Sequence, residues 1–131
     1  LNLLWLKKCL VKNQEKSEIV MATSINLVTG DTLPTLTLTI TDATTRTVVD
    51  LSDDDIEVKL HFRLKGDDTI IASLDCFPVT DGSDGKVLLY FGNLLTTIEA
   101  GKYEGEVEIK LGTQTQTVYD PIQFTVREQF A

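Results

Sequence analysis

Residues 35–41 alternate threonine with aliphatic side chains, and this two-residue period constrains the fold more than any other feature of the chain. Successive side chains of a β-strand point to opposite faces, so the pattern predicts a strand with one apolar face. The β-branched threonines favour the same conformation. We expect the aliphatic residues in the core and the threonines on the outer face: Leu36, Leu38 and Ile40 inside, Thr35, Thr37, Thr39 and Thr41 outside.

Short strands with turns at steps of roughly ten residues fill the chain after Met21, and no sustained helical period interrupts them. We expect strands at 24–28, 35–42, 57–64, 69–74, 76–80, 86–91 and 103–111, a hairpin-like excursion at 48–51, one helical turn at 94–98, and a long last strand over 113–128 kinked at Pro121. This spacing predicts an all-β protein, an antiparallel immunoglobulin-like β-sandwich of about seven to nine strands.

The stretch "EAGKYEGEV" at 99–107 is typical of a tyrosine corner. In that motif the Tyr103 hydroxyl bonds to nearby backbone at the start of a late strand. The two cysteines, Cys9 and Cys76, lack the immunoglobulin spacing, so we expect two free thiols in a reducing cytosol, with Cys76 buried.

The first 20 residues, "LNLLWLKKCLVKNQEKSEIV", form a separate segment, and residues 21–131 form the sandwich domain. The apolar run is too short for a secretory or membrane-spanning segment. Read as a short helix, it has a narrow apolar stripe that includes Trp5, Leu6 and Leu10. Two interpretations stay open: an upstream extension of a reading frame that starts at Met21, or an arm that docks on a partner.

The charge of the chain is unevenly distributed, with a net of −8 overall. Residues 1–20 hold four lysines and two glutamates, which leaves 8 of the 12 basic and 18 of the 20 acidic residues in the rest, a net of −10. An acidic body repels phosphate, so we expect neither nucleic acid nor an anionic membrane as a partner.

The residue types of common catalytic and metal sites are scarce. His61 is the only histidine, it falls on the polar face of strand 57–64, and no nucleophile elbow, P-loop or dinucleotide fingerprint occurs. We therefore expect no enzyme activity, no zinc or other metal and no cofactor. The acidic clusters at 53–55, 67–68 and 81–84 leave calcium open as an alternative to ordinary turn chemistry.

A carbohydrate site on a sandwich is typically built on exposed aromatic rings. Tyr90, Phe91, Tyr103 and Phe124 lie in core-like contexts, so Tyr119 is the ring that we expect on the surface. The residues predicted for partner contact are Trp5, Leu6, Leu10, Thr35, Thr37, Thr39 and Tyr119.

Several short patterns between residues 25 and 127 resemble one family. They are Gly30-Asp31-Thr32 with Pro34, the Thr/Leu strand ending at Asp42, Asp50-Leu51, a V-x-L-x-F strand, and "AGKYEGE" at 100–106. Together they resemble the immunoglobulin-like N-terminal domain of tailed-phage baseplate upper proteins and related small virion proteins.

The resemblance implies a non-enzymatic structural component of a tailed-phage virion, in the baseplate, tail or neck. Its partners would be other virion proteins, with a homo-oligomer or ring expected, and its place would be the virion, assembled in the host cytoplasm. Baseplate upper proteins continue into a long helical region, whereas this sequence stops at Ala131. A capsid decoration protein, or a glycan- or receptor-binding module displayed on the particle, is therefore the alternative.

Overall fold

A computed structural model describes residues 8–13, 19–21, 24–42 and 46–130, with 8–13 and 19–21 described by their backbone alone. These residues form ten strands: β1 (Lys8–Asn13), β2 (Ile19–Met21), β3 (Ile25–Val28), β4 (Thr35–Thr41), β5 (Ile56–Leu64), β6 (Ile70–Pro78), β7 (Lys86–Tyr90), β8 (Gly101–Leu111), β9 (Gln114–Thr117) and β10 (Ile122–Arg127). One short helix, α1 (Leu94–Thr97), follows β7. None of the described helical residues forms a segment long and apolar enough to cross a bilayer.

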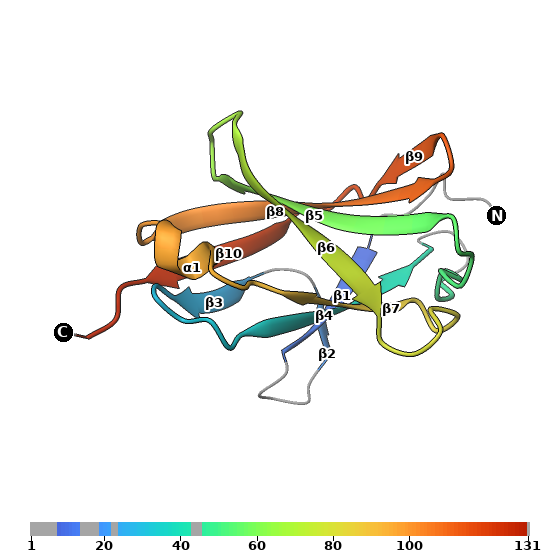
Figure 1. Ribbon diagram of the computed structural model, residues 1–131, viewed down its shortest axis with the longest axis horizontal. Coiled ribbons are helices and arrows are strands. Elements are labelled where there is room, and N and C mark those ends of the chain that lie inside the picture. Colours follow the sequence, from blue (N-terminus) through green and yellow to red (C-terminus); the bar gives the residue numbers. More distant parts are fainter. Residues whose placement is uncertain (1–7, 14–18, 22–23, 43–45, 131) are drawn as a thin grey trace.

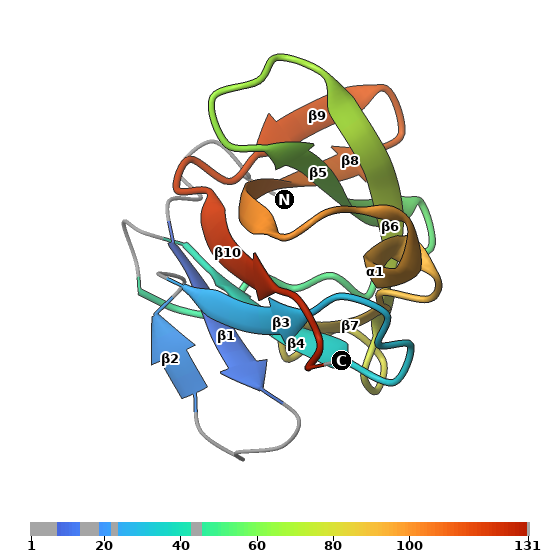
Figure 2. The same ribbon diagram turned by 90° about the vertical axis from the view of Figure 1, so that its left-hand side faces the viewer.

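The strands form one curled sheet in the order β2-β1-β4-β7-β6-β5-β8-β10-β3, with β9 paired to β8. Because the sheet curls, β4 and β7 lie in one layer while β5, β8 and β10 lie in another (Figures 1 and 2). Strand β6 joins the layers, since it pairs with β5 through Ile70–Cys76 and with β7 through Cys76–Pro78. All pairs are antiparallel except β3 with β10. The predicted all-β sandwich is confirmed, and the eight strands after residue 24 match the expected number.

The core lies between the two layers. Leu36, Leu38 and Ile40 are at most 1% exposed, as the alternation in β4 predicts. They belong to one buried cluster with aromatic residues from the opposite layer and the β7–α1 loop, in which the centroid of the Phe124 ring lies 5.0 Å from that of Phe62 and 6.0 Å from that of Phe91. Burial of these side chains is the main favourable term in the stability of the sandwich.

The tyrosine corner is present at the start of β8. The Tyr103 hydroxyl donates a hydrogen bond of 2.7 Å to the backbone carbonyl of Glu99, and the Tyr103 ring stacks on Phe62 at 5.1 Å. Burial, followed by the nearby Glu99 carboxylate, raises the pKa of the phenol. This is the bond that the sequence predicted, and it marks the sandwich as immunoglobulin-like.

The part of the N-terminal segment that the structure describes is extended, and is not the short helix considered from the sequence. Over Lys8–Asn13 it is a strand, β1, that pairs antiparallel with β4 along all six of its residues, from Lys8 opposite Thr41 to Asn13 opposite Leu36. A single amphipathic helix of this length is marginal in water, whereas the edge of β4 offers a row of backbone partners.

Three other boundaries differ from those predicted. Strand β6 is continuous through Asp75, because the Asp75 carboxylate lies on the outer side, 3.5 Å from the Lys59 amine. The long last strand is two strands, β9 and β10, since Pro121 before β10 cannot donate a ladder hydrogen bond. The expected hairpin-like excursion at 48–51 is limited to one antiparallel bridge, between Thr41 and Val48, beside which the Val49 N–H donates to the Ile40 carbonyl.

Candidate functional site

The outer side of β4, β7 and the end of β6 carries a group of uncharged side chains that are exposed or half-buried. We call this group the threonine–aromatic face; its members are Thr35, Thr37, Phe77, Val79, Leu88 and Tyr90. Tyr90 is 58% exposed and Phe77 is 54% exposed, while the threonines and Leu88 are half-buried. Large apolar side chains at that exposure, gathered on a rigid sheet, are typical of protein contact surfaces.

Strand register brings these residues together. Thr37 lies opposite Leu88, and Leu88 lies opposite Phe77, so the three form one row across β4, β7 and β6. Thr35 lies opposite Tyr90 in the neighbouring row. Directly opposed residues of an antiparallel ladder share a face, so threonine hydroxyls border the aromatic rings on one surface.

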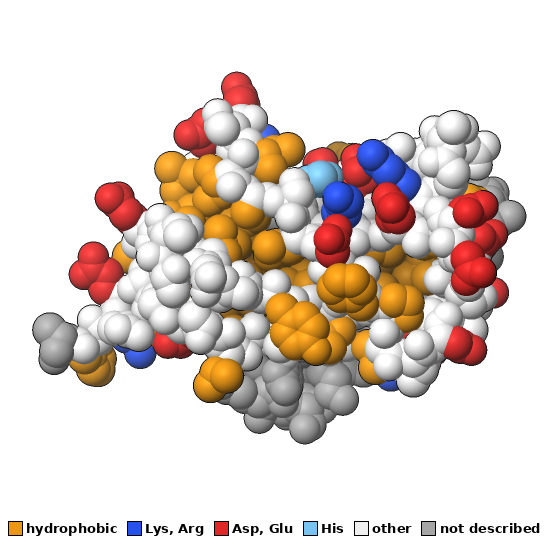
Figure 3. Space-filling view, in the orientation of Figure 1, with side chains coloured by type: hydrophobic (Ala, Val, Ile, Leu, Met, Phe, Trp, Pro, Cys, Tyr) orange, Lys and Arg blue, Asp and Glu red, His pale blue; other side chains and the backbone are white. Residues whose placement is uncertain are grey.

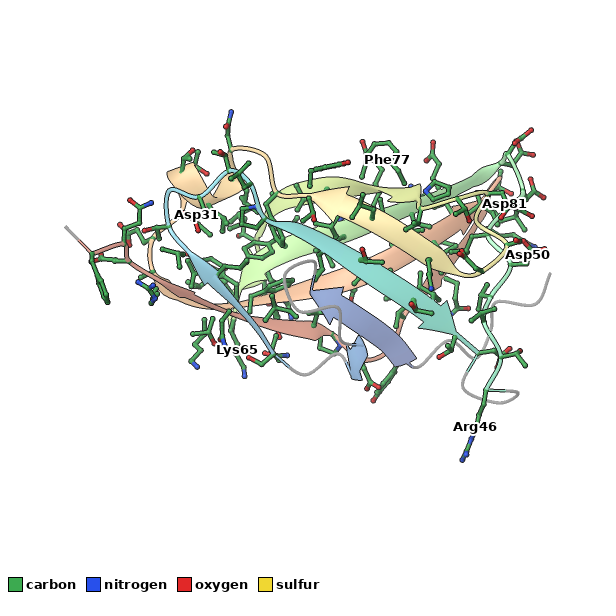
Figure 4. The ribbon with its side chains drawn as sticks, turned by 90° about the horizontal axis from the view of Figure 1, so that it is seen from below. Asp31, Arg46, Asp50, Lys65, Phe77 and Asp81 are labelled. Atoms are coloured by element: carbon green, nitrogen blue, oxygen red, sulfur yellow. The ribbon has the colours of Figure 1, made fainter. Side chains whose placement is uncertain are left out.

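The space-filling view shows this surface as apolar side chains flanked by charged ones (Figure 3). Phe77 projects outward from its strand (Figure 4). Charged side chains begin at the border, where Asp75 precedes Phe77 on β6 and Lys86 is opposite Thr39. An uncharged centre with a charged rim is the composition of a protein–protein interface.

The sequence predicted part of this face. It named Thr35 and Thr37, which lie there, and Thr39, which is buried at 6% exposure in the middle of the β1–β4–β7 ladder. Thr39 alternates with the inward Leu38 and Ile40, as predicted, but it is not solvent-accessible, because strands pair with β4 on both sides of it. Tyr90 was expected in the core but is exposed. It is the last residue of β7, and its side chain points away from the core because that of the preceding Leu89 points into it.

The other predicted contact residues are Tyr119, Leu10, Trp5 and Leu6. Tyr119 is 78% exposed, as predicted, in the segment between β9 and β10. Leu10 lies on β1 in register with Thr39 and Met21. Trp5 and Leu6 lie outside the described residues. Phe77 was missed, although the alternation of β6 around buried Cys76 was a usable signal that its neighbour points outward.

The outer side of the second layer is different, because it is covered by paired charges. Arg63 donates to the Glu104 carboxylate from two nitrogens, at 2.7 and 2.8 Å. His61 lies on this polar side, as predicted, with its ring nitrogens 2.7 Å from the Ser73 hydroxyl and 3.4 Å from the Glu108 carboxylate. These contacts are those of a solvated strand face whose charges satisfy one another.

The acidic loops show ordinary turn chemistry. Five aspartates each accept a hydrogen bond from the backbone N–H two residues later: Asp50, Asp53, Asp67, Asp81 and Asp84. Hydrogen bonds from the Ser52 hydroxyl and backbone lower the pKa of Asp50, and Ser83 does the same for Asp81. Asp50 and Asp81 lie at one end of the sandwich (Figure 4). Within the described residues, His, Cys, Asp and Glu side chains form no group of three placed for a metal.

Cys76 is buried at 7% exposure, as predicted. Burial, and then the neighbouring Asp75 carboxylate, raises the pKa of its thiol to about 12. A thiol of this kind is inert at neutral pH, because the reactive species is the thiolate.

A groove of about 830 Å³ lies between β3 and β4. Its lining includes Ile25, Leu36 and Phe91 from the core side and the exposed loop residue Leu33. Asp31 is the one charged residue among the described residues that line the groove. Its carboxylate accepts a long hydrogen bond (3.4 Å) from the Gln129 side-chain amide. This lining does not bring together an acid and a base, so the threonine–aromatic face is the stronger candidate site.

Comparisons with known proteins give little further information. No family model matches the chain, and no curated protein matches it. Among solved structures, the chain is similar to AggA, the major subunit of aggregative adherence fimbriae type I from Escherichia coli, with a TM-score of 0.36 and 13% identity over 94% of this chain and 98% of that chain. A similarity this low supports no conclusion about function.

Proposed function

We propose that this protein is a non-enzymatic structural subunit that assembles with other proteins through the threonine–aromatic face, and that its assembly is a tailed-phage virion. The observation that carries the assembly role is the row Thr37–Leu88–Phe77 with Tyr90 beside it. It presents two large exposed rings on paired strands, so little conformational entropy is lost when a partner covers them.

The virion assignment rests on the sequence resemblance over residues 25–127. The resemblance includes "AGKYEGE" at 100–106, the stretch in which Tyr103 makes the tyrosine corner. The non-enzymatic character is supported by a sequence that holds one histidine and no recognised catalytic motif. Baseplate, tail and neck are the positions that we propose first.

The test is to locate the chain in purified phage particles with an antibody and to count its copies by quantitative mass spectrometry. Copies at the tail or neck in multiples of three or six would support a ring in the tail assembly. Copies spread over the shell would instead identify a capsid decoration protein. Absence of the chain from particles would refute the virion role.

A second candidate function is glycan or receptor binding. It is favoured by the exposed rings of Tyr90, Phe77 and Tyr119, because aromatic faces stack on sugars. Substituting Tyr119 or Tyr90 by Ala would then abolish binding to host cells while leaving incorporation into particles intact. Loss of incorporation from the Phe77 and Tyr90 variants, with host binding by the chain undetectable, would exclude this alternative.

A further inference from the structure

We propose that the threonine–aromatic face binds the same face of a second copy of this chain, in a two-fold symmetric contact. This inference rests on the proposed function, because it names the partner that the face binds. The test distinguishes the inference from the proposed function, because self-association can be measured with the purified chain alone.

Charge selects this face for contact between copies. Residues 21–131 carry a net charge of −10, so two copies repel each other over most of their surfaces. The outer side of the second layer carries the ion pairs Lys59–Asp75 and Arg63–Glu104, which a contact would have to desolvate. The six residues of the threonine–aromatic face carry no charge, and the charged residues in register with β4 beside it are Lys12, opposite Thr37, and Lys86, opposite Thr39. A contact centred on the six residues therefore desolvates fewer charges than one on the outer side of the second layer.

The row across the three strands is complementary in shape to itself. It has a small residue, Thr37, at the β4 end, Leu88 in the middle and a large ring, Phe77, at the β6 end. A two-fold axis that lies in the plane of the contact, runs parallel to β7 and passes over Leu88 places Phe77 of one copy over Thr37 of the other, and the reverse, with the two Leu88 side chains in contact at the axis. The Phe77 ring of each copy then covers Thr37 of the other copy. An isologous interface requires this kind of self-complementarity.

The size of the face sets the expected strength. Six residues a side are few compared with the 20–30 of a standard interface, so we expect a dissociation constant of about 10–100 μM. Contacts of this strength are populated when many copies are held close together in a ring or shell, because linkage raises the effective concentration.

Salt dependence distinguishes this contact from one made by the basic N-terminal segment on the acidic body. Screening weakens the net repulsion between two copies, so sedimentation equilibrium should show tighter dimerisation as NaCl rises from about 50 to about 500 mM. Association through the N-terminal lysines would weaken over the same range. A wild-type chain that stays monomeric up to about 500 μM at both salt concentrations would overturn the inference.

A charge-swap experiment tests the geometry. Phe77→Asp and Thr37→Lys should each weaken dimerisation at least about tenfold, while Tyr119→Asp, on an exposed ring away from the face, should leave it unchanged. An equimolar mixture of Phe77→Asp and Thr37→Lys should recover dimers, because the carboxylate introduced in one copy then faces the amine introduced in the other. Far-ultraviolet circular dichroism checks that each variant is folded.

Two outcomes would contradict the proposed contact. Failure of the mixture to form dimers, with both variants folded, would refute the ring-over-threonine packing. Unchanged dimerisation of Phe77→Asp would refute the face as the site. If the purified wild-type chain is monomeric and yet Phe77→Asp is lost from particles, the proposed function survives and the partner is a different protein.

Discussion

The hydroxyl of Tyr103 holds the backbone carbonyl of Glu99 at 2.7 Å, and this bond ties the loop after α1 to the start of β8. The ring that carries the hydroxyl is 5% exposed and stacks on Phe62, so the hydroxyl has a fixed position. Tyr103→Phe keeps the ring and leaves the Glu99 carbonyl without this donor. We expect the free energy of unfolding to fall by about 1–2 kcal/mol, measured by urea denaturation.

The matched control is Tyr119→Phe, which removes a hydroxyl from a ring that is 78% exposed. Its effect should stay within about 0.5 kcal/mol. Equal stabilities of Tyr103→Phe and the wild type would show that the Tyr103–Glu99 bond does not stabilise the sandwich.

Gly82 and Gly66 provide a second matched pair, because both have a positive φ, +87° and +86°. A Cβ at position 82 would lie 2.6 Å from the Leu51 carbonyl oxygen, whereas a Cβ at position 66 would meet nothing within 4 Å. Gly66→Ala should cost about 1–2 kcal/mol from the backbone conformation alone. Gly82→Ala should cost at least about 1 kcal/mol more, since the Leu51 N–H also donates to the Gly82 carbonyl. Thermal or urea unfolding of both variants gives the difference, and equal costs would contradict the close approach.

The thiol of Cys76 should resist modification in the folded protein, because burial and Asp75 raise its pKa to about 12. In a Cys9→Ser variant, a thiol reagent at pH 8 should label the native chain slowly and the urea-unfolded chain within seconds to minutes. Fast stoichiometric labelling without urea would contradict the burial of this side chain.

The same shift predicts a pH dependence of stability. The unfolded thiol ionises near its ordinary pKa of 9.0, while the folded thiol ionises near 12, so the folded state binds this proton more tightly. The contribution is fully present below about pH 9 and is lost as pH rises toward 12. Replacing Cys76 by Ala should reduce the fall in stability over that window, relative to the parent chain. An identical fall in the free energy of unfolding of both chains would refute the raised pKa of Cys76 as a source of this pH dependence.

Strand β1 is expected to protect the edge of β4. Val11 has register partners on both sides, Val20 on β2 and Leu38 on β4, so a proline there removes a ladder hydrogen bond on one side. Val11→Pro should lower the free energy of unfolding by about 2 kcal/mol and speed amide hydrogen exchange in β4, whereas Val11→Thr should do neither. Unchanged exchange in β4 of Val11→Pro would show that β1 does not cover this edge.

The layout of the sandwich was predictable where one face of a strand is buried. The alternations in β4, β5 and β8 identified their inward residues, because a two-residue period admits a single choice of face. Leu64 is the exception: it continues the apolar alternation of Val58, Leu60 and Phe62, yet it is 41% exposed at the end of β5.

The candidate site was less predictable than the fold. The threonines were visible as a polar stripe, but their neighbours come from strands distant in sequence, through pairs such as Thr37 with Leu88 and Leu88 with Phe77. Tyr90 was assigned to the core on hydrophobicity alone. A tyrosine at the end of a strand is found both in cores and on surfaces, so the local sequence does not decide between them. Likewise, the pairing of β1 with β4 depends on a vacant strand edge that no local pattern encodes.

The central claim is that the threonine–aromatic face holds this protein in an assembly, and its most direct test is incorporation into phage particles. Phage carrying Phe77→Asp, Tyr90→Asp or Tyr119→Asp in this chain would be purified, and the copies per particle counted by quantitative mass spectrometry. We predict that Phe77→Asp and Tyr90→Asp reduce the copies at least about tenfold, because each introduces a charge into the uncharged face, while Tyr119→Asp retains the wild-type number. Wild-type copy numbers for all three variants, with the proteins expressed at equal levels, would contradict the account.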